Sequence, residues 1–159
     1  MKKIITLVFL ITGFNCMAQP ETDKDKLDVQ EKIDLFFQSL ETKDTALYKT
    51  LAFTNGQIWT VRRVQDTLKN STRTIAEDIK RLAIMKEVIE ERALNYEIKI
   101  HHDIAVAWVP YTLSQGGKFS HCGIDVFTLL RTTDGWKIVN ASYSVEPNGC
   151  AALEKYKRK

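Results

Sequence analysis

This sequence lacks the short motifs that identify a catalytic or cofactor-binding site directly. It contains no GxxxxGK phosphate-binding loop, no GxGxxG dinucleotide fingerprint, no GxSxG nucleophile elbow and no CxxC pair. Proline and glycine are scarce, with 3 and 7 residues among 159, and no segment is repetitive. With 44% hydrophobic residues, the composition is that of one globular domain and excludes a disordered chain. We expect no cofactor.

A strong excess of one charge is lacking too. The chain has 23 Lys and Arg residues against 20 Asp and Glu residues, a formal net charge of +3. Two of the lysines, Lys2 and Lys3, lie in an N-terminal segment that we expect to be removed, so the mature protein is close to neutral. No basic stripe is visible, and we expect no nucleic-acid partner. The chain closes on a basic segment, residues 151–159, which we expect to form an exposed tail.

The N-terminus carries a short apolar run rather than a long one. Two lysines precede an apolar stretch at residues 4–12, and small residues up to Ala18 fit a cleavage site that leaves Gln19 first. These features predict a secretory signal peptide over residues 1–18. The protein is then periplasmic or secreted, with no membrane contact after cleavage.

Two alternatives to a cleaved signal peptide stay open. An uncleaved N-terminal anchor is disfavoured because the apolar run is too short to span a bilayer. A lipid anchor on Cys16 is disfavoured because Gly13 and Asn15 do not fit the usual pattern before the lipidated cysteine. Residues 19–27, which follow, are polar and are expected to form a flexible leader.

Cysteine is scarce, and the few residues present have a specific consequence. Of three cysteines, Cys16 leaves with the predicted signal peptide, so Cys122 and Cys150 remain in an oxidising compartment. An even pair of thiols there favours a disulfide, with two unrelated thiols as the alternative. Such a bridge would close a loop of about 29 residues, worth on the order of 3 kcal/mol in the chain-entropy model.

Helical periodicity marks three segments. The first helix is expected to begin near Asp28, and the second begins at Asp44 and ends at Asn55-Gly56. The third is expected to be capped within residues 70–72. Their apolar stripes are Val29, Ile33, Phe36, Phe37 and Leu40 in the first, Ala46, Leu47, Tyr48 and Leu51 in the second, and Ile75, Ile79, Leu82 and Ala83 in the third.

Strand periodicity accounts for most of the remaining chain. Strands are expected in segments bounded by turn residues, at positions 57–64, 87–100, 104–113, 118–131 and 136–145. Apolar and polar residues alternate within 87–100, and residues 104–113 are mostly apolar. Helices that cannot bury their stripes alone pack on a sheet, and a curved sheet offers one concave face. The order of elements therefore predicts an α+β fold, with three N-terminal helices on the concave face of a curved, mainly antiparallel sheet.

This order, together with particular words of sequence, resembles the nuclear transport factor 2-like superfamily. The words are IDLFFQSLETKDTALYKTL, AVAWVPYTL, GKFSHCGIDVFTLLRTTDGWKIV and SYSV, and the resemblance covers residues 28–146. It is nearest to exported bacterial members of the SnoaL-like or lumazine-binding type. It implies one cone-shaped domain, which we place at residues 28–150, with a pocket between the first and third helices and the sheet. Function does not follow, because the superfamily includes enzymes, binders and oligomerisation domains.

Enzymatic members of the superfamily project Asp, His or Tyr into the pocket. The resemblance therefore implies Asp125, His121 and Tyr111 as catalytic candidates, and the same three with Phe36 and Trp59 as ligand-binding candidates. Asp125 and His121 lie four residues apart in one strand, so both face the same side with Cα atoms about 13 Å apart. They can act together only across a bound substrate or through a residue of a neighbouring strand.

Two readings of Asp125 stay open. A carboxyl group in an apolar site can have a raised pKa and act as a general acid or base. The more frequent role of a buried acid is structural, in a hydrogen-bond network.

The register of the Gly116-Gly117 hairpin is open as well. A two-residue loop places His121 opposite Thr112, and a three-residue loop places it opposite Tyr111. We favour the second register, in which Tyr111 and His121 are cross-strand neighbours. In either register Cys122 faces away from His121, as suits a structural disulfide.

Two further clusters carry charge or metal-binding groups. His101, His102 and Asp103 occupy a tight turn, where side chains diverge, so we expect no metal site. Arg62 and Arg63 alternate in a strand, so one of them can point inward toward an anionic ligand, although an exposed pair is more frequent.

The leading functional prediction is an exported protein that binds a small, partly apolar molecule in the cavity. The first alternative is a cofactor-free lyase or isomerase of the SnoaL-like type, with Asp125 as base and Tyr111 or His121 as donor. The second is a homodimeric structural or interaction domain, because apolar residues on both faces of residues 118–131 fit a sheet that is covered on both sides.

Overall fold

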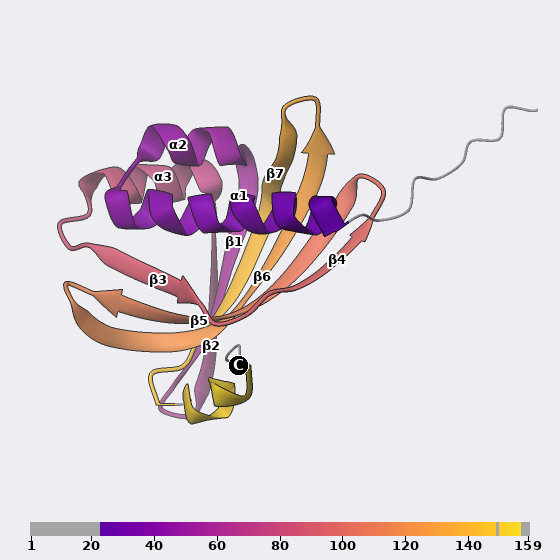
Figure 1. Ribbon diagram of the computed structural model, residues 1–159. Helices are drawn as coiled ribbons and strands as arrows, with labels where there is room; N and C mark the ends of the chain where they lie inside the picture. The colour runs from indigo at the N-terminus through magenta and orange to yellow at the C-terminus, as the bar shows by residue number, and fades with distance from the viewer. Residues whose placement is uncertain (1–22, 149, 157–159) are drawn as a thin grey trace, which may run out of the picture.

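Three helices lie on the concave face of a strongly curved, seven-stranded sheet in the computed structural model (Figure 1). The structure describes residues 23–148 and 150–156. Its elements are α1 (Asp23–Thr42), α2 (Thr45–Leu51), β1 (Ala52–Val64), β2 (Thr67–Thr74), α3 (Ile75–Ile84), β3 (Ile89–Ala93), β4 (Glu97–His101), β5 (Ile104–Gln115), β6 (Lys118–Thr132), β7 (Gly135–Val145) and the 3-10 helix η1 (Cys150–Tyr156). The predicted α+β class is confirmed.

The strands follow the order β2-β1-β7-β6-β5-β3, and β4 also pairs with β5. All pairs are antiparallel except β1 with β7, which is parallel. Residues 87–100, expected as one strand, form β3 and β4 instead, separated at Leu94, Asn95 and Tyr96. Both pair with the same edge of β5, so the break lets that edge follow the curvature of the sheet.

The first helix begins five residues before the predicted start. Residues 23–27, expected as part of the leader, are the first turns of α1. Lys24 pairs with Asp28 at 2.5 Å one turn along, and Asp25 accepts from Arg131 of β6 at 2.6 Å. These contacts hold an exposed first turn that has no apolar stripe, which is why periodicity did not reveal it. Residues 1–22, which contain the predicted signal peptide and Cys16, lie outside the described residues.

The segment before α3 corrects a second prediction. Residues 67–74 form β2, a hairpin partner of β1, and the cap of α3 is Thr74 rather than a residue in 70–72. Thr74 and Glu77 form a reciprocal capping box. Most of β2 is exposed on both faces, so no apolar alternation marked it as a strand.

The core lies between the helices and the concave face. The predicted stripes of all three helices contribute to it, and so do the odd-numbered residues of β5 and β6. Aromatic rings fill its centre: Phe36 packs edge to face on Phe127 at 5.5 Å and on Tyr48 at 5.1 Å. Asp44 caps α2 as predicted, accepting from the amides of Ala46 and Leu47.

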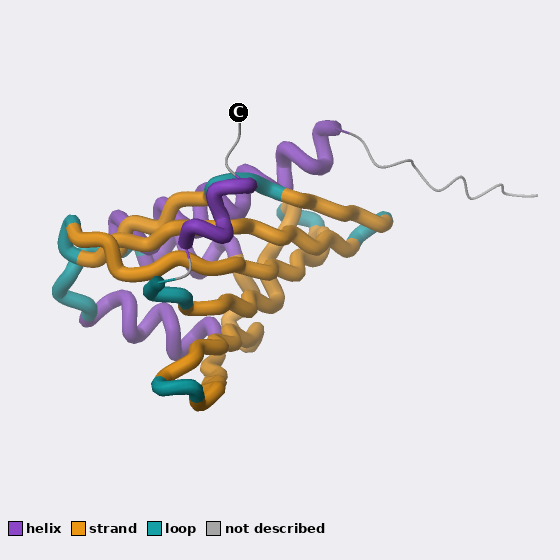
Figure 2. The backbone as a smooth tube through the Cα atoms, turned by 90° about the horizontal axis from the view of Figure 1, so that it is seen from below, coloured by secondary structure: helices purple, strands orange, loops and turns teal. Residues whose placement is uncertain are grey.

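The opposite, convex face carries the disulfide. Cys122 and Cys150 are bonded, with Cα atoms 5.7 Å apart, which confirms the predicted pairing. The bridge holds η1 against the outer side of the sheet (Figure 2), so residues 151–156 of the expected tail form a 3-10 helix there, with Leu153 buried. Within the described residues, no helix is long and apolar enough to cross a membrane.

Candidate functional site

A cavity of about 490 Å³ lies between the helices and the concave face of the sheet. Apolar side chains of α1, α3 and the following loop form one wall: Phe36, Leu40, Leu82 and Met85. The strands form the other wall, which is more polar. The position matches the pocket that the superfamily resemblance implied.

The strand wall is layered along the strand direction. Asp125 of β6 pairs with Tyr143 of β7, which pairs with Thr60 of β1, so these three side chains form one polar row on the concave face. Two residues deeper, Phe127 pairs with Ala141, and Ala141 with Ile58, so the inner row is apolar. The cavity thus has an apolar inner end and a polar middle.

Asp125 lies inside this cavity, as predicted, and its side chain is nearly inaccessible at 4% exposure. Its neighbour is Glu91 of β3, which is 8% exposed and lines the same cavity. The two carboxyl groups form a hydrogen bond with each other. Asp125 Oδ2 is buried and has no hydrogen-bond partner among the described residues.

Burial is the main cause of the unusual acidity of this pair. It raises the pKa of Glu91 to about 8, an effect that the hydrogen bond with Asp125 partly offsets. Burial and then the charge of Glu91 raise the pKa of Asp125 well above its ordinary range. Two carboxyl groups at one site cannot both ionise cheaply, so at neutral pH the pair keeps a proton.

His121 also lies on the cavity wall, on the same face as Asp125, as predicted. Its Nδ1 is 3.0 Å from the Ser120 hydroxyl, and its Nε2 is buried without a partner among the described residues. Burial lowers the pKa of His121, so the ring is neutral at pH 7. A neutral ring with one free nitrogen can bind or exchange a proton with a ligand.

The register around His121 differs from both predicted alternatives. The turn has two residues, with Gln115 opposite Lys118, so the favoured three-residue loop is wrong. A bulge then shifts the pairing by one residue, and His121 lies opposite Leu113. Tyr111 is a diagonal neighbour, and its ring meets that of His121 edge to face at 5.8 Å.

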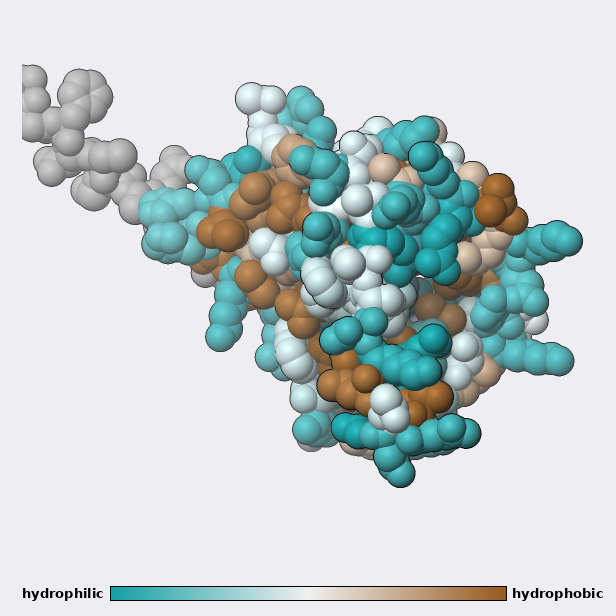
Figure 3. Space-filling view, turned by 180° about the vertical axis from the view of Figure 1, so that it is seen from behind, coloured by the Kyte–Doolittle hydropathy of each residue, from teal (hydrophilic) through white to brown (hydrophobic). Residues whose placement is uncertain are grey.

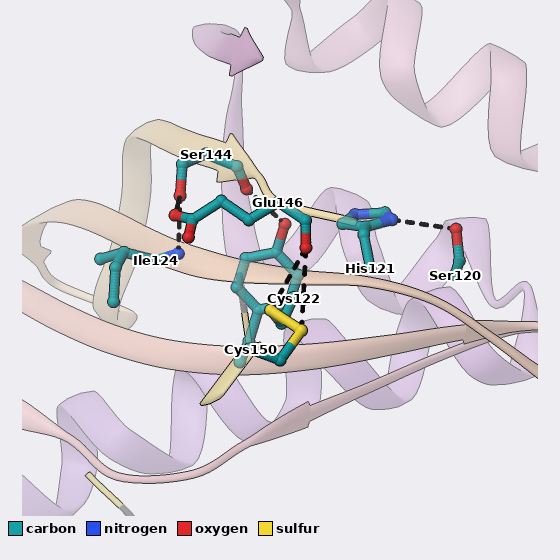
Figure 4. Close-up of a disulfide and its surroundings, with 8 residues drawn as sticks. Ser120, His121, Cys122, Ile124, Ser144, Glu146 and Cys150 are labelled. Carbon is teal, nitrogen blue, oxygen red and sulfur yellow. Dashed lines mark hydrogen bonds between the residues drawn. A yellow bond between two sulfur atoms is a disulfide. The ribbon is translucent and has the colours of Figure 1, made fainter. Parts of the chain in front are cut away.

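Tyr111 lines the cavity, but its hydroxyl is already engaged. The hydroxyl donates to the Ser144 carbonyl at 2.7 Å, and the ring lies opposite Gly123, where no side chain stands in its way. Burial raises the pKa of Tyr111, so it stays protonated. Ser144 in turn accepts from the Ile124 amide, and β6 is bridged to Glu146 beside the disulfide (Figure 4). The hydroxyl proton of Tyr111 is therefore directed at the Ser144 carbonyl, while the side chain forms part of the cavity wall.

A second cluster of polar side chains, which includes Asp78 and Arg73, lines the cavity on the side of α3. Asp78 accepts hydrogen bonds from the Tyr48 hydroxyl at 3.1 Å and from Arg73. Arg73 also lies 3.4 Å from the hydroxyl of Tyr143, in the polar row. The carboxylate and guanidinium neutralise each other, so this group fixes α3 to the sheet.

One predicted wall residue lies elsewhere. Trp59 points to the convex face, is 43% exposed, and does not line the cavity, which is lined by its neighbours Ile58 and Thr60. β1 pairs with β7 in a register that turns even-numbered residues inward, and single-strand periodicity could not decide which face was concave. Phe36 does line the cavity, as predicted.

Sequence reasoning missed Glu91, Thr60 and Tyr143. Glu91 lies in the charged run Glu90-Glu91-Arg92, where nothing in the sequence separates the buried acid from its less buried neighbours, and Thr60 resembles any strand threonine. The described residues contain no group of three His, Cys, Asp or Glu side chains that could hold a metal. The rings of His101 and His102 meet edge to face in their turn.

No family model and no curated protein matches this chain in sequence. Solved structures do match. A nuclear transport factor 2-like protein from Cytophaga hutchinsonii aligns with a TM-score of 0.64 at 14% identity, covering 79% of this chain and 99% of its own. A protein of unknown function with a cystatin-like fold from Nostoc punctiforme aligns with a TM-score of 0.64 at 16% identity. The alignment covers 80% of this chain and 95% of that protein.

A third similar structure is a nuclear transport factor 2-like protein from Streptomyces avermitilis that carries a provisional dehydratase assignment. It aligns with a TM-score of 0.61 at 17% identity, covering 77% of this chain and 96% of its own. The chain therefore has the nuclear transport factor 2-like fold, as the sequence resemblance predicted. At such identities the likeness defines the fold, and the function must be argued from the cavity.

Proposed function

We propose that the protein is an exported binding protein for a small, partly apolar molecule. The observation that carries this is a cavity whose wall holds buried polar atoms with no hydrogen-bond partner in the described part of the chain: Thr60 Oγ1 and His121 Nε2. Buried polar groups nearly always have a hydrogen-bond partner, and an unpaired one costs about 1 to 3 kcal/mol. A ligand with a hydrogen-bonding group would supply the missing partners.

The layering of the wall supports a ligand with two unlike ends. Phe36 and Phe127 enclose the inner end, where an alkyl or aromatic group loses water contact. The polar row of Thr60, Tyr143 and Asp125 would meet a hydroxyl, carbonyl or amide group. Export is supported by the Cys122–Cys150 disulfide, which persists in oxidising compartments.

Native mass spectrometry of protein purified from its own host tests this function. We expect a bound mass that is lost on denaturation, and weaker retention in Thr60→Val. The outward-facing neighbour gives a matched control, Trp59→Phe, which should retain the ligand like the natural protein. Equal retention by Thr60→Val and the control would contradict the placement of the ligand against this row.

A cofactor-free lyase or isomerase is the second candidate, and the Asp125–Glu91 pair favours it. Asp125, which holds the shared proton because Glu91 raises its pKa, could donate that proton to a leaving group, and the unpartnered Nε2 of the neutral His121 could accept one from a substrate carbon. Tyr111 is unsuited as donor because its hydroxyl is committed to Ser144. The dehydratase assignment of the Streptomyces avermitilis protein points the same way. Asp125→Asn that retains turnover on an identified substrate would remove this candidate.

The homodimer stays a proposal that the convex face supports. Several large apolar side chains are exposed there on β1 and β5: Trp59, Val61, Ile104, Val106 and Trp108. Figure 3 shows the molecule from behind, with apolar side chains gathered in patches between polar ones. Exposed apolar patches are a frequent mark of an interaction site in soluble proteins.

A further inference from the structure

We propose that the cavity selects an organic anion, an apolar molecule whose carboxylate is held at the mouth by Arg62, with Arg81 adding positive charge from the opposite wall. This inference rests on the proposed binding function and names its ligand class. It follows from the placement of charged side chains around the cavity.

Arg62 and Arg63 are adjacent, but the sheet sends them to different places. Arg62 lines the cavity and remains exposed, so it stands at the mouth. Arg63 does not line it and donates to the Asp66 carbonyl in the β1–β2 turn at 3.0 Å. On the opposite wall, Arg81 of α3 also lines the cavity and is exposed. Neither Arg62 nor Arg81 has an acidic partner among residues 23–148 and 150–156.

The other charges of the cavity do not balance these two arginines. Arg73 and Asp78 neutralise each other. The Glu91–Asp125 pair keeps a proton and so contributes at most one negative charge at neutral pH. The cavity as a whole is therefore positive, although the protein is close to neutral. The positive charge of the cavity would repel a cationic ligand and attract an anionic one.

The register places the anion site at a defined depth. Arg62 pairs with Val145, one step of two residues outward from the row in which Thr60 pairs with Tyr143. Two strand residues span about 7 Å. A ligand with its carboxylate at Arg62 would therefore place its middle at the polar row and its apolar end beside Phe36 and Phe127.

Three probes with one tail and different heads test the inference: decanoate, decan-1-ol and decylammonium, titrated at pH 7 by calorimetry. We expect decanoate to bind most tightly and decylammonium most weakly. Arg62→Gln should weaken decanoate about fivefold and leave decan-1-ol unchanged, since a partly exposed charge pair contributes up to about 1 kcal/mol. Raising the salt concentration should weaken decanoate alone.

Arg63→Gln is the matched control, because it removes the same charge one residue away but outside the cavity, and it should bind decanoate like the natural protein. Equal losses in Arg62→Gln and Arg63→Gln would show a general charge effect and overturn the inference. Decan-1-ol or decylammonium binding as tightly as decanoate would overturn it too, while leaving the binding function intact. Failure of all three probes to bind would count against the binding function itself.

Discussion

The carboxyl groups of Asp125 and Glu91 are buried, and their burial makes the free energy of unfolding depend on pH. Because burial raises the folded-state pKa of Glu91 from its ordinary 4.5 to about 8, the folded protein binds more protons than the unfolded chain between these values. The stabilisation is complete below about pH 4.5 and is lost as the pH rises through 8. We expect urea titrations to give a lower free energy of unfolding at pH 9 than at pH 6.

Glu91→Gln isolates this effect, since the amide keeps a hydrogen-bonding group but cannot ionise. The variant should lose the part of the fall in stability between pH 6 and pH 9 that Glu91 contributes, while the part due to Asp125, whose pKa is raised chiefly by its own burial, remains. Glu97→Gln, which removes an exposed carboxylate of β4, is the control and should keep the fall. A pH dependence that is identical in both variants would mean that the buried pair does not titrate in this range.

Gly123 is the position where a single added carbon should do the most harm. A Cβ there would lie 2.1 Å from the backbone oxygen of Ser144, the atom that accepts from Tyr111. The backbones of two paired strands cannot move apart easily to make room for this atom. We therefore expect Gly123→Ala to destabilise the protein by about 2 to 3 kcal/mol in chemical denaturation. Thr128→Ala, on the outer side of the same strand, should change stability far less. A Gly123→Ala protein of natural stability would contradict the close packing described.

At the scale of elements, the disulfide joins η1 to the outer side of β6. Figure 4 shows the bridge and the ring of His121 on opposite sides of the strand, so the bridge stands outside the cavity. Cys122 and Cys150 are 28 residues apart in sequence. Cross-linking a loop of this length is worth about 3 to 4 kcal/mol.

We therefore expect the double substitution Cys122→Ala with Cys150→Ala to lower the melting temperature by about 10 °C. Decanoate affinity, if the cavity binds it, should stay within about twofold of the natural protein, because the bridge lies on the other face. Reduction of the natural protein with a thiol reagent should reproduce the shift in scanning calorimetry. A melting temperature that the substitutions leave unchanged would count against a stabilising bridge.

At the scale of the whole molecule, the exposed apolar residues of the convex face predict self-association. Val106→Lys places a charge within this surface and should shift the protein from dimer to monomer in sedimentation velocity experiments at micromolar concentration. Ile84→Lys is the control, since Ile84 is 81% exposed on α3, away from the sheet. A natural protein that sediments as a monomer would contradict the homodimer.

The sequence by itself determined the local features. Helical stripes, the Asp44 cap, the alternation that puts His121 and Asp125 on one face and Cys122 on the other, and the disulfide all followed from spacing or from an even count of cysteines. These features depend on neighbours within one or two turns of helix or a few strand residues. The fold class followed from their order along the chain.

The tertiary structure alone decided how strands distant in sequence meet. Pairing between β1, β6 and β7 turned Trp59 outward and Arg62 and Thr60 inward. Curvature brought Glu91 of β3 against Asp125 of β6, although their strands are separated by β5. Alternation along one strand fixes which residues share a face, but only pairing and curvature fix which face encloses the cavity, and the chemistry of the site depends on that.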